Sequence, residues 1–144
     1  MRQDSHMSKL PGWQTRLLTT VKELSSTPFS WGENDCCTFA AKCVDAQYNT
    51  NIYAQIAGKY STELGSKRFS IEKVGTSYLP TLLDAYLSER VDKNFAQRGD
   101  VVTFEGALGL TAGILWTGYV WAMGPNGVET FPLNKIKITD IWRV

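Results

Sequence analysis

A cysteine in the first turn of a predicted helix is the residue of this chain best suited to chemistry. Segment 29–39, Phe-Ser-Trp-Gly-Glu-Asn-Asp-Cys-Cys-Thr-Phe, predicts a loop that enters a helix at Cys36. A helix start offers unpaired backbone N–H groups and the positive end of the macrodipole, which favour a thiolate and can hold an oxyanion. Cys36 is therefore a candidate nucleophile; the alternative is a small buried helix residue.

The chain lacks an obvious base for such a nucleophile. A thiol of this kind needs an imidazole to accept its proton, and the only histidine is His6, in an N-terminal segment that we do not expect to fold. A carboxylate such as Glu105 is a poor substitute, because its ordinary pKa of about 4.3 is badly matched to a thiol. The sequence thus contains half of a hydrolase site.

The length, charge and apolar content of the chain indicate which classes of partner are not implied. The 144 residues suit one domain. Fifteen basic and 14 acidic side chains give a net charge of +1, so nothing indicates a nucleic acid or an anionic membrane as partner. No apolar run approaches the roughly 20 residues that span a bilayer, and no secretory signal is evident. We expect no membrane span.

The cysteines do not indicate a disulfide scaffold or a metal site. There are three, Cys36, Cys37 and Cys43, which favours a reducing compartment during synthesis. Adjacent helical residues point roughly 100° apart, and a fourth zinc ligand is not evident. We therefore expect no metal and no cofactor.

Helical periodicity dominates the first two thirds of the chain. Residues 1–8 are tag-like, which leaves one domain over residues 9–144. Apolar spacing predicts helices over about 13–24 and 35–46, the second capped by Asn34 or Asp35. Further helical segments are expected between residues 51 and 90, with Asn51 and Thr62 as caps.

From Gly99 the pattern changes to short β-prone runs separated by glycine-rich turns. The runs are residues 100–104, 113–116, 119–123, 128–131 and 138–144. Helices followed by strands predict an α+β domain, with N-terminal helices packed on a C-terminal antiparallel sheet. Asp100 is interpreted as a turn residue at the entry to the first strand that hydrogen-bonds local backbone.

Several of these motifs together carry a family resemblance. Trp-Gly-x-Asn-Asp-Cys at residues 31–36, Arg-Gly-Asp-Val-Val at 98–102 and a following Gly-Ile strand resemble the NlpC-type papain-like cell-wall peptidases. The chain most resembles their phage tail-tip branch, which ends in Pro-Leu and Trp-Arg elements, here residues 132–133 and 142–143. The resemblance implies a papain-like fold and a cysteine that attacks peptide bonds in peptidoglycan stem peptides.

The resemblance also assigns catalytic positions. Cys36 matches the nucleophile, Asp35 matches the acidic residue before it, and Cys37 replaces the usual serine. Aligning the family's His-Val-Gly-Ile strand with residues 111–114 puts Thr111 at the position of the base. Threonine cannot shuttle a proton near neutral pH, and loss of a triad member costs orders of magnitude in rate. For Asp35, the role of N-cap is an alternative to that of catalytic acid.

Four further residues are candidates for lining a cleft. Trp31, Gly32 and Asn34 precede the nucleophile, and Trp121 falls where the family often has a second polar residue. The alternative for Trp31 and Gly32 is that they shape the turn and cover the helix end.

The resemblance implies a phage tail-tip protein, made in the bacterial host cytoplasm and then carried in the virion tail. Its partners would be other tail proteins and peptidoglycan stem peptide. We expect a catalytically degenerate domain with a structural or binding role. The alternative is an active cysteine peptidase or amidase with an unorthodox or borrowed base. A host-directed effector that uses the aromatic side chains for recognition is a third hypothesis.

Overall fold

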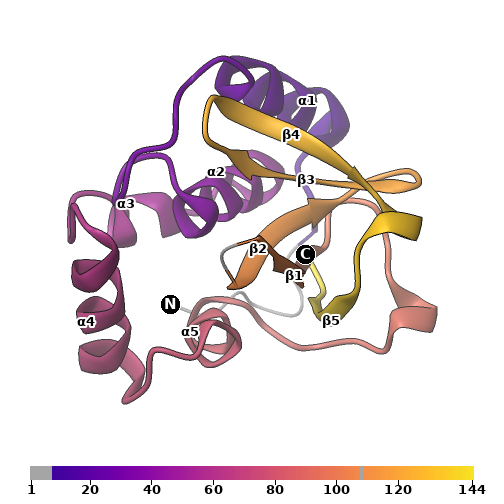
Figure 1. Ribbon diagram of the computed structural model, residues 1–144. Coiled ribbons are helices and arrows are strands. Elements are labelled where there is room, and N and C mark those ends of the chain that lie inside the picture. The colour runs from indigo at the N-terminus through magenta and orange to yellow at the C-terminus, as the bar shows by residue number, and fades with distance from the viewer. Residues whose placement is uncertain (1–7, 108) are drawn as a thin grey trace.

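The chain folds into helices followed by strands, as predicted (Figure 1). The computed structural model describes residues 8–107 and 109–144, so His6 and most of the tag-like segment lie outside the described residues. The helices are α1 (Trp13–Leu24), α2 (Cys36–Tyr48), α3 (Ile52–Ile56), α4 (Glu63–Val74) and α5 (Leu79–Tyr86). The strands are β1 (Val101–Gly106), β2 (Gly109–Leu115), β3 (Tyr119–Gly124), β4 (Gly127–Pro132) and β5 (Ile138–Trp142). Short 3-10 helices cover Lys93–Phe95 and Leu133–Lys135.

The strands form one antiparallel sheet in the order β4-β3-β2-β1-β5. The predicted α+β class and antiparallel sheet are confirmed. Successive side chains of a strand point to opposite faces, and a hydrophobic cluster lies on each face of this sheet. Residues such as Val101, Ala112 and Ile114 pack against the helices, whereas Val102 and Phe104 belong to a second cluster on the other face.

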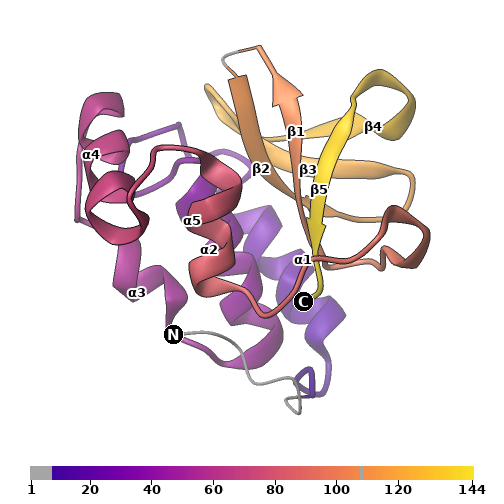
Figure 2. The same cartoon turned by 90° about the horizontal axis from the view of Figure 1, so that it is seen from below.

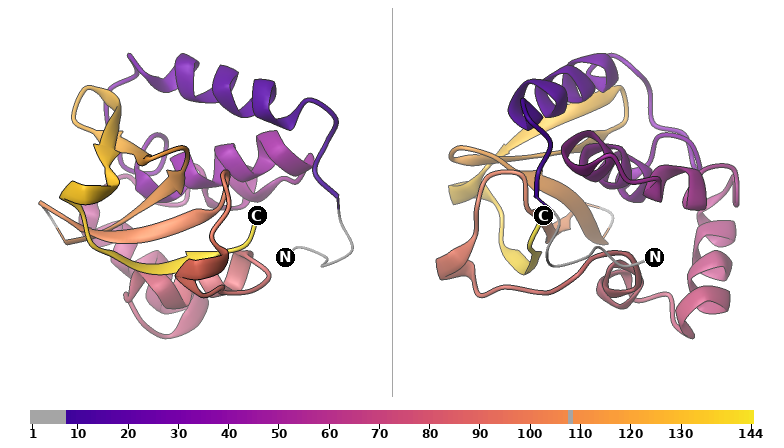
Figure 3. Two further views of the ribbon diagram at one scale, coloured as in Figure 1. Left: turned by 90° about the vertical axis from the view of Figure 1, so that its right-hand side faces the viewer. Right: turned by 180° about the vertical axis from the view of Figure 1, so that it is seen from behind.

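Helix α2 is central because its side chains are buried nearly all round. Phe39, Ala40, Cys43 and Val44 are at most 3 % exposed, and α2 contacts α1, α3, β2 and β3. Figure 3 shows α1 and α2 side by side. Figure 2 shows α4 as the helix farthest from the sheet, with α5 between it and β2. Among the described residues, no helix combines the length and apolarity needed to cross a membrane.

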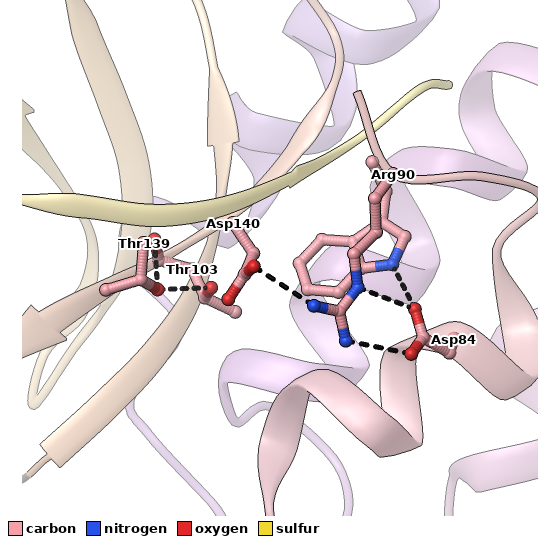
Figure 4. Close-up of polar contacts among 6 residues, drawn as sticks. Asp84, Arg90, Thr103, Thr139 and Asp140 are labelled. Atoms are coloured by element: carbon pink, nitrogen blue, oxygen red, sulfur yellow. Dashed lines mark hydrogen bonds and ion pairs between the residues drawn. The ribbon is translucent and has the colours of Figure 1, made fainter. Parts of the chain in front are cut away.

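A polar network fastens α5 to β5 (Figure 4). The Arg90 guanidinium donates to both carboxylate oxygens of Asp84, at 2.9 and 2.8 Å, and to Asp140 Oδ1 at 3.1 Å. The buried indole of Trp142 donates to Asp84 Oδ1 at 2.9 Å. The tryptophan of the closing Trp-Arg element is thus a structural anchor between a helix and an edge strand.

Asp100 joins two sequence motifs that lie far apart in the chain. Its buried carboxylate accepts hydrogen bonds from Gln97 N–H at 2.8 Å and Val144 N–H at 2.9 Å. Arg143 Nε lies 3.4 Å from Asp100 Oδ1. The predicted bond to local backbone is present, and the Gly-Asp motif additionally holds the end of the Trp-Arg element.

The predicted cap of α4 is confirmed, whereas the predicted cap of α3 is wrong. Thr62 caps α4, accepting from Gly65 N–H at 2.9 Å. Asn51 makes no side-chain cap bond to α3. Instead, Asp45 of α2 accepts from the N–H groups of Ile52 at 2.9 Å and Tyr53 at 3.0 Å. A carboxylate carries full negative charge toward the helix dipole, which favours it over a neutral amide.

Alanine substitutions at two glycines test whether the β3–β4 turn packs closely against the end of α1. Gly127 has φ +141°, and a Cβ there would lie 2.1 Å from the Ser25 carbonyl oxygen, whereas Gly118, with φ +81°, has open space. Gly118→Ala carries only the backbone penalty, about 1 kcal/mol. We expect Gly127→Ala to lower the free energy of unfolding, measured in urea, clearly more than Gly118→Ala does. An equal loss in the two variants would contradict the close approach of the turn to α1.

Candidate thiol site at the start of helix α2

The start of α2 is built around the carboxylate of Asp35, which is 1 % exposed. Oδ1 accepts from Cys37 N–H at 2.9 Å and Thr38 N–H at 3.0 Å, while Oδ2 accepts from Gly32 N–H at 2.8 Å and the Tyr60 hydroxyl at 2.7 Å. The Thr38 hydroxyl accepts in return from Asp35 N–H at 2.8 Å, which completes a capping box. These contacts support the N-cap interpretation of Asp35, because its lone pairs are committed to structure.

The loop before α2 is held by residues that were candidates for lining a cleft. The Asn34 amide, 5 % exposed, donates to the carbonyls of Thr27 at 2.9 Å and Pro28 at 3.1 Å. Gly32 has φ +81°, and a Cβ there would lie 1.8 Å from the Tyr60 carbonyl oxygen. Both residues therefore shape the turn.

Trp31 and Trp121 lie in aromatic contacts. Trp31 is half-buried and packs edge-on against Phe29, with ring centroids 4.9 Å apart. Trp121, 5 % exposed, stacks on Trp116 at 5.0 Å and meets Tyr119 at 5.6 Å. It shares the helix-facing side of the sheet with Ile114, its cross-strand partner, and so contributes to the core.

Cys36 is a partly exposed residue in the first turn of α2. Its electrostatic surroundings include the Cys37 thiol and the backbone amides of Ala112 and Cys37, which favour the thiolate. Led by the Cys37 bond, these donors lower the pKa of Cys36, although burial and the Asp35 charge act in the opposite direction. The site therefore favours a thiolate without a positively charged neighbour.

The two other thiols differ from Cys36. The hydrogen bond to Cys36, together with burial, raises the pKa of Cys37 well above its ordinary value. Burial likewise raises the pKa of Cys43, which is 0 % exposed. Cys37 also lines a cavity of about 20 Å³ between α2, α3 and α5, together with Leu82 and Tyr86. Of the three thiols, only that of Cys36 has a lowered pKa.

Thr111 does not face Cys36, so the alignment that placed it at the position of the base is wrong. Thr111 is the cross-strand partner of Phe104, and such partners share a face of the sheet. Phe104 packs in the cluster that faces away from the helices, and the Thr111 hydroxyl donates to the Gly109 carbonyl at 3.2 Å. Its neighbour Ala112 contacts Cys36, through a backbone amide rather than a side-chain base.

The described residues supply no base for the thiol. They contain no histidine, since His6 lies outside them. The Tyr60 hydroxyl is committed to Asp35, and burial, with the neighbouring Cys37 and Asp35 charges, raises its pKa. The described part of the chain therefore favours a thiolate at Cys36 without an imidazole beside it.

Sequence reasoning missed three residues of this site. Tyr60, 25 positions from Asp35, closes the cap, Ala112 supplies an N–H donor to Cys36, and Tyr86 faces the cavity beside Cys37. Backbone donors and long-range tyrosine contacts leave no motif in the sequence, whereas Cys36 and Asp35 were identified from their spacing.

A comparison with known protein families matches nearly the whole chain to a family domain. The model for a domain of unknown function, DUF6950, matches residues 8–144. The chain belongs to this family. No curated protein matches it. The match includes the thiol loop and the closing Trp-Arg element within one family domain.

Removing the cap charge tests the role of Asp35. Asp35→Asn should destabilise the fold by about 2 kcal/mol or more in urea unfolding, because an amide cannot satisfy four buried donors as a carboxylate does. Tyr60→Phe deletes a single donor and is expected to cost only about 1 kcal/mol. A neutral Asp35→Asn variant would contradict the structural role of this carboxylate.

Alkylation kinetics test the state of Cys36. A thiol reacts as its thiolate, so a lowered pKa moves the rise in iodoacetamide rate to a pH below the ordinary value of about 8.5. We expect this for the wild-type chain and loss of the rapid phase in Cys36→Ser, because the pKa values of Cys37 and Cys43 are raised. A rate that rises only above pH 8.5 would show that Cys36 is not activated.

Proposed function

We propose that this chain is an NlpC-like domain of a phage tail tip whose hydrolytic centre is incomplete and which has a structural or binding role. The observation that carries the proposal is the pairing of Cys36 with a strand that offers it an amide of Ala112 and no basic side chain. A cysteine at a helix start against an antiparallel sheet is the arrangement that the resemblance implies. The assignment to a phage tail is supported by the sequence pattern of residues 31–36, 98–102 and 142–143.

The chemistry explains why hydrolysis is not favoured. A thiolate can attack an amide carbonyl, but the amine leaves only when it receives a proton, which an imidazolium supplies in a cysteine peptidase. Near Cys36 the candidate donors hold their protons firmly, since the pKa values of Cys37 and Tyr60 are both raised. Attack without departure of the amine returns the starting peptide.

The second candidate is an active cysteine peptidase, and one observation favours it. The pKa of Cys36 is lowered, so the first requirement of nucleophilic catalysis is present without a base in the described residues. A histidine lent by a partner protein, or His6 of this chain, would then complete the site.

Peptidoglycan digestion separates the two candidates. Purified sacculi are incubated with the wild-type chain, Cys36→Ala and His6→Ala, with an active endopeptidase as positive control, and released stem peptides are identified by mass spectrometry. We expect no release above the Cys36→Ala background. Release that requires Cys36 would overturn the proposal, and its loss in His6→Ala would identify the base.

A further inference from the structure

The Lys9 amine is held against the protein without a carboxylate partner. It lies over the ring of Trp13, 3.7 Å from the ring centroid, and donates to the Arg98 carbonyl at 3.3 Å. Among the described residues, no carboxylate forms an ion pair with this amine. We propose that Lys9 is a modification site at which activated acyl donors of the acyl phosphate class transfer their acyl group to the amine. The proposal does not depend on whether the domain cleaves peptidoglycan.

A small space at Gly99 connects this amine to a buried acceptor. Gly99 has φ +94°, and a Cβ there would lie 2.9 Å from the Lys9 amine nitrogen and 2.4 Å from Gln47 Oε1. Because glycine leaves this space open, the amine and the amide oxygen border the same gap.

The Gln47 oxygen at this gap is unpartnered. Gln47 is 0 % exposed, and its Nε2 donates to the carbonyls of Cys43 at 3.2 Å and Gly99 at 3.0 Å. Its Oε1 has no hydrogen-bond partner in the described part of the chain. A buried polar atom left without a partner is costly, so a donor delivered to this gap would be stabilising.

The product of acylation matches this gap. An ammonium brings a full charge into a half-buried place, which is costly, whereas an amide carries no charge. The amide keeps one N–H group, which can donate to Gln47 Oε1 across the space at Gly99. Acylation of Lys9 therefore removes a disfavoured charge and supplies a donor to the buried oxygen.

The surroundings also make the amine available for reaction. A lysine attacks as its neutral amine, and desolvation or a nearby cation increases the neutral fraction. Burial lowers the pKa of Lys9 to about 8; the Asp100 charge opposes this change, and the charges of Arg143 and Arg98 add to it. Asp100 opposes it only in part, because its carboxylate is already bound by two backbone N–H groups and lies 3.4 Å from Arg143 Nε.

The acyl transfer balances without an oxidant. The neutral amine attacks the carbonyl carbon of an acyl phosphate, and a C–N bond forms. The bond between that carbon and the bridging oxygen breaks, and its electron pair leaves with the phosphate. The proton lost by the nitrogen passes to the phosphate, which departs as hydrogen phosphate.

Acetylation by acetyl phosphate tests the site. The folded wild-type chain is incubated at about pH 8, and acetylation of each lysine is followed by peptide mass spectrometry. We expect Lys9 to react about tenfold faster than the exposed Lys59, because its neutral fraction at this pH exceeds that of a lysine with the ordinary pKa of about 10.4. In concentrated urea, which unfolds the chain, this preference should disappear.

Two variants and one internal control accompany the measurement. The α-amino group of the chain, with an ordinary pKa of about 8, shows that the reagent is active. Lys9→Arg should lose the fast adduct alone. Gln47→Glu places a carboxylate at the gap, so it should raise the pKa of Lys9 and slow its acetylation several-fold while Lys59 is unchanged. Circular dichroism confirms that each variant is folded.

Three results would overturn the proposal. The first is a folded wild-type chain in which Lys9 reacts no faster than Lys59 although the α-amino group is acetylated. The second is a preference for Lys9 that persists in urea, since it would then come from the local sequence. The third is an unchanged Lys9 rate in folded Gln47→Glu; if that variant does not fold, the comparison in urea still decides. Digestion of sacculi is scored separately, so failure of the acylation site and failure of the proposed function are distinguishable.

Discussion

One buried carboxylate organises the part of the molecule that bears on function. Asp35 accepts hydrogen bonds from Gly32 N–H, Cys37 N–H, Thr38 N–H and the Tyr60 hydroxyl, all between 2.7 and 3.0 Å. Charge-assisted bonds of this kind are stronger than neutral ones, and any donor left unpaired would be costly. The carboxylate therefore fixes the loop, the first turn of α2 and the segment around Tyr60 in one arrangement.

The position of the thiol follows from this constraint. With the first turn of α2 fixed, Cys36 is held beside strand β2, whose Ala112 backbone helps to lower the pKa of the thiol. The causes that favour its thiolate are neutral groups, the Cys37 thiol and the backbone amides of Ala112 and Cys37. Asp35 thus serves the fold directly, as the cap of the helix that carries Cys36.

The sequence was sufficient for features that depend on local periodicity and composition. The spacing of Leu17, Val21 and Leu24 predicted α1, and the change from helical spacing to short β-prone runs predicted the α+β class. Thr62 and Asp35 were identified as caps because their side chains act within three residues of their own position.

Features that depend on register or long-range contact could not be predicted. A shift of one residue in a strand moves a side chain to the other face, and for this reason Thr111 was assigned to the thiol while Ala112 is its neighbour. Asp45, which lies on helix α2, caps α3 in place of the predicted Asn51.

The most direct test of the central role of Asp35 is amide hydrogen exchange at Cys37 and Thr38. First-turn amides normally exchange fast because they lack intrahelical partners. The structure predicts that these two exchange nearly as slowly as the core amides of α2, and exchange at the rate of an unstructured peptide would contradict it.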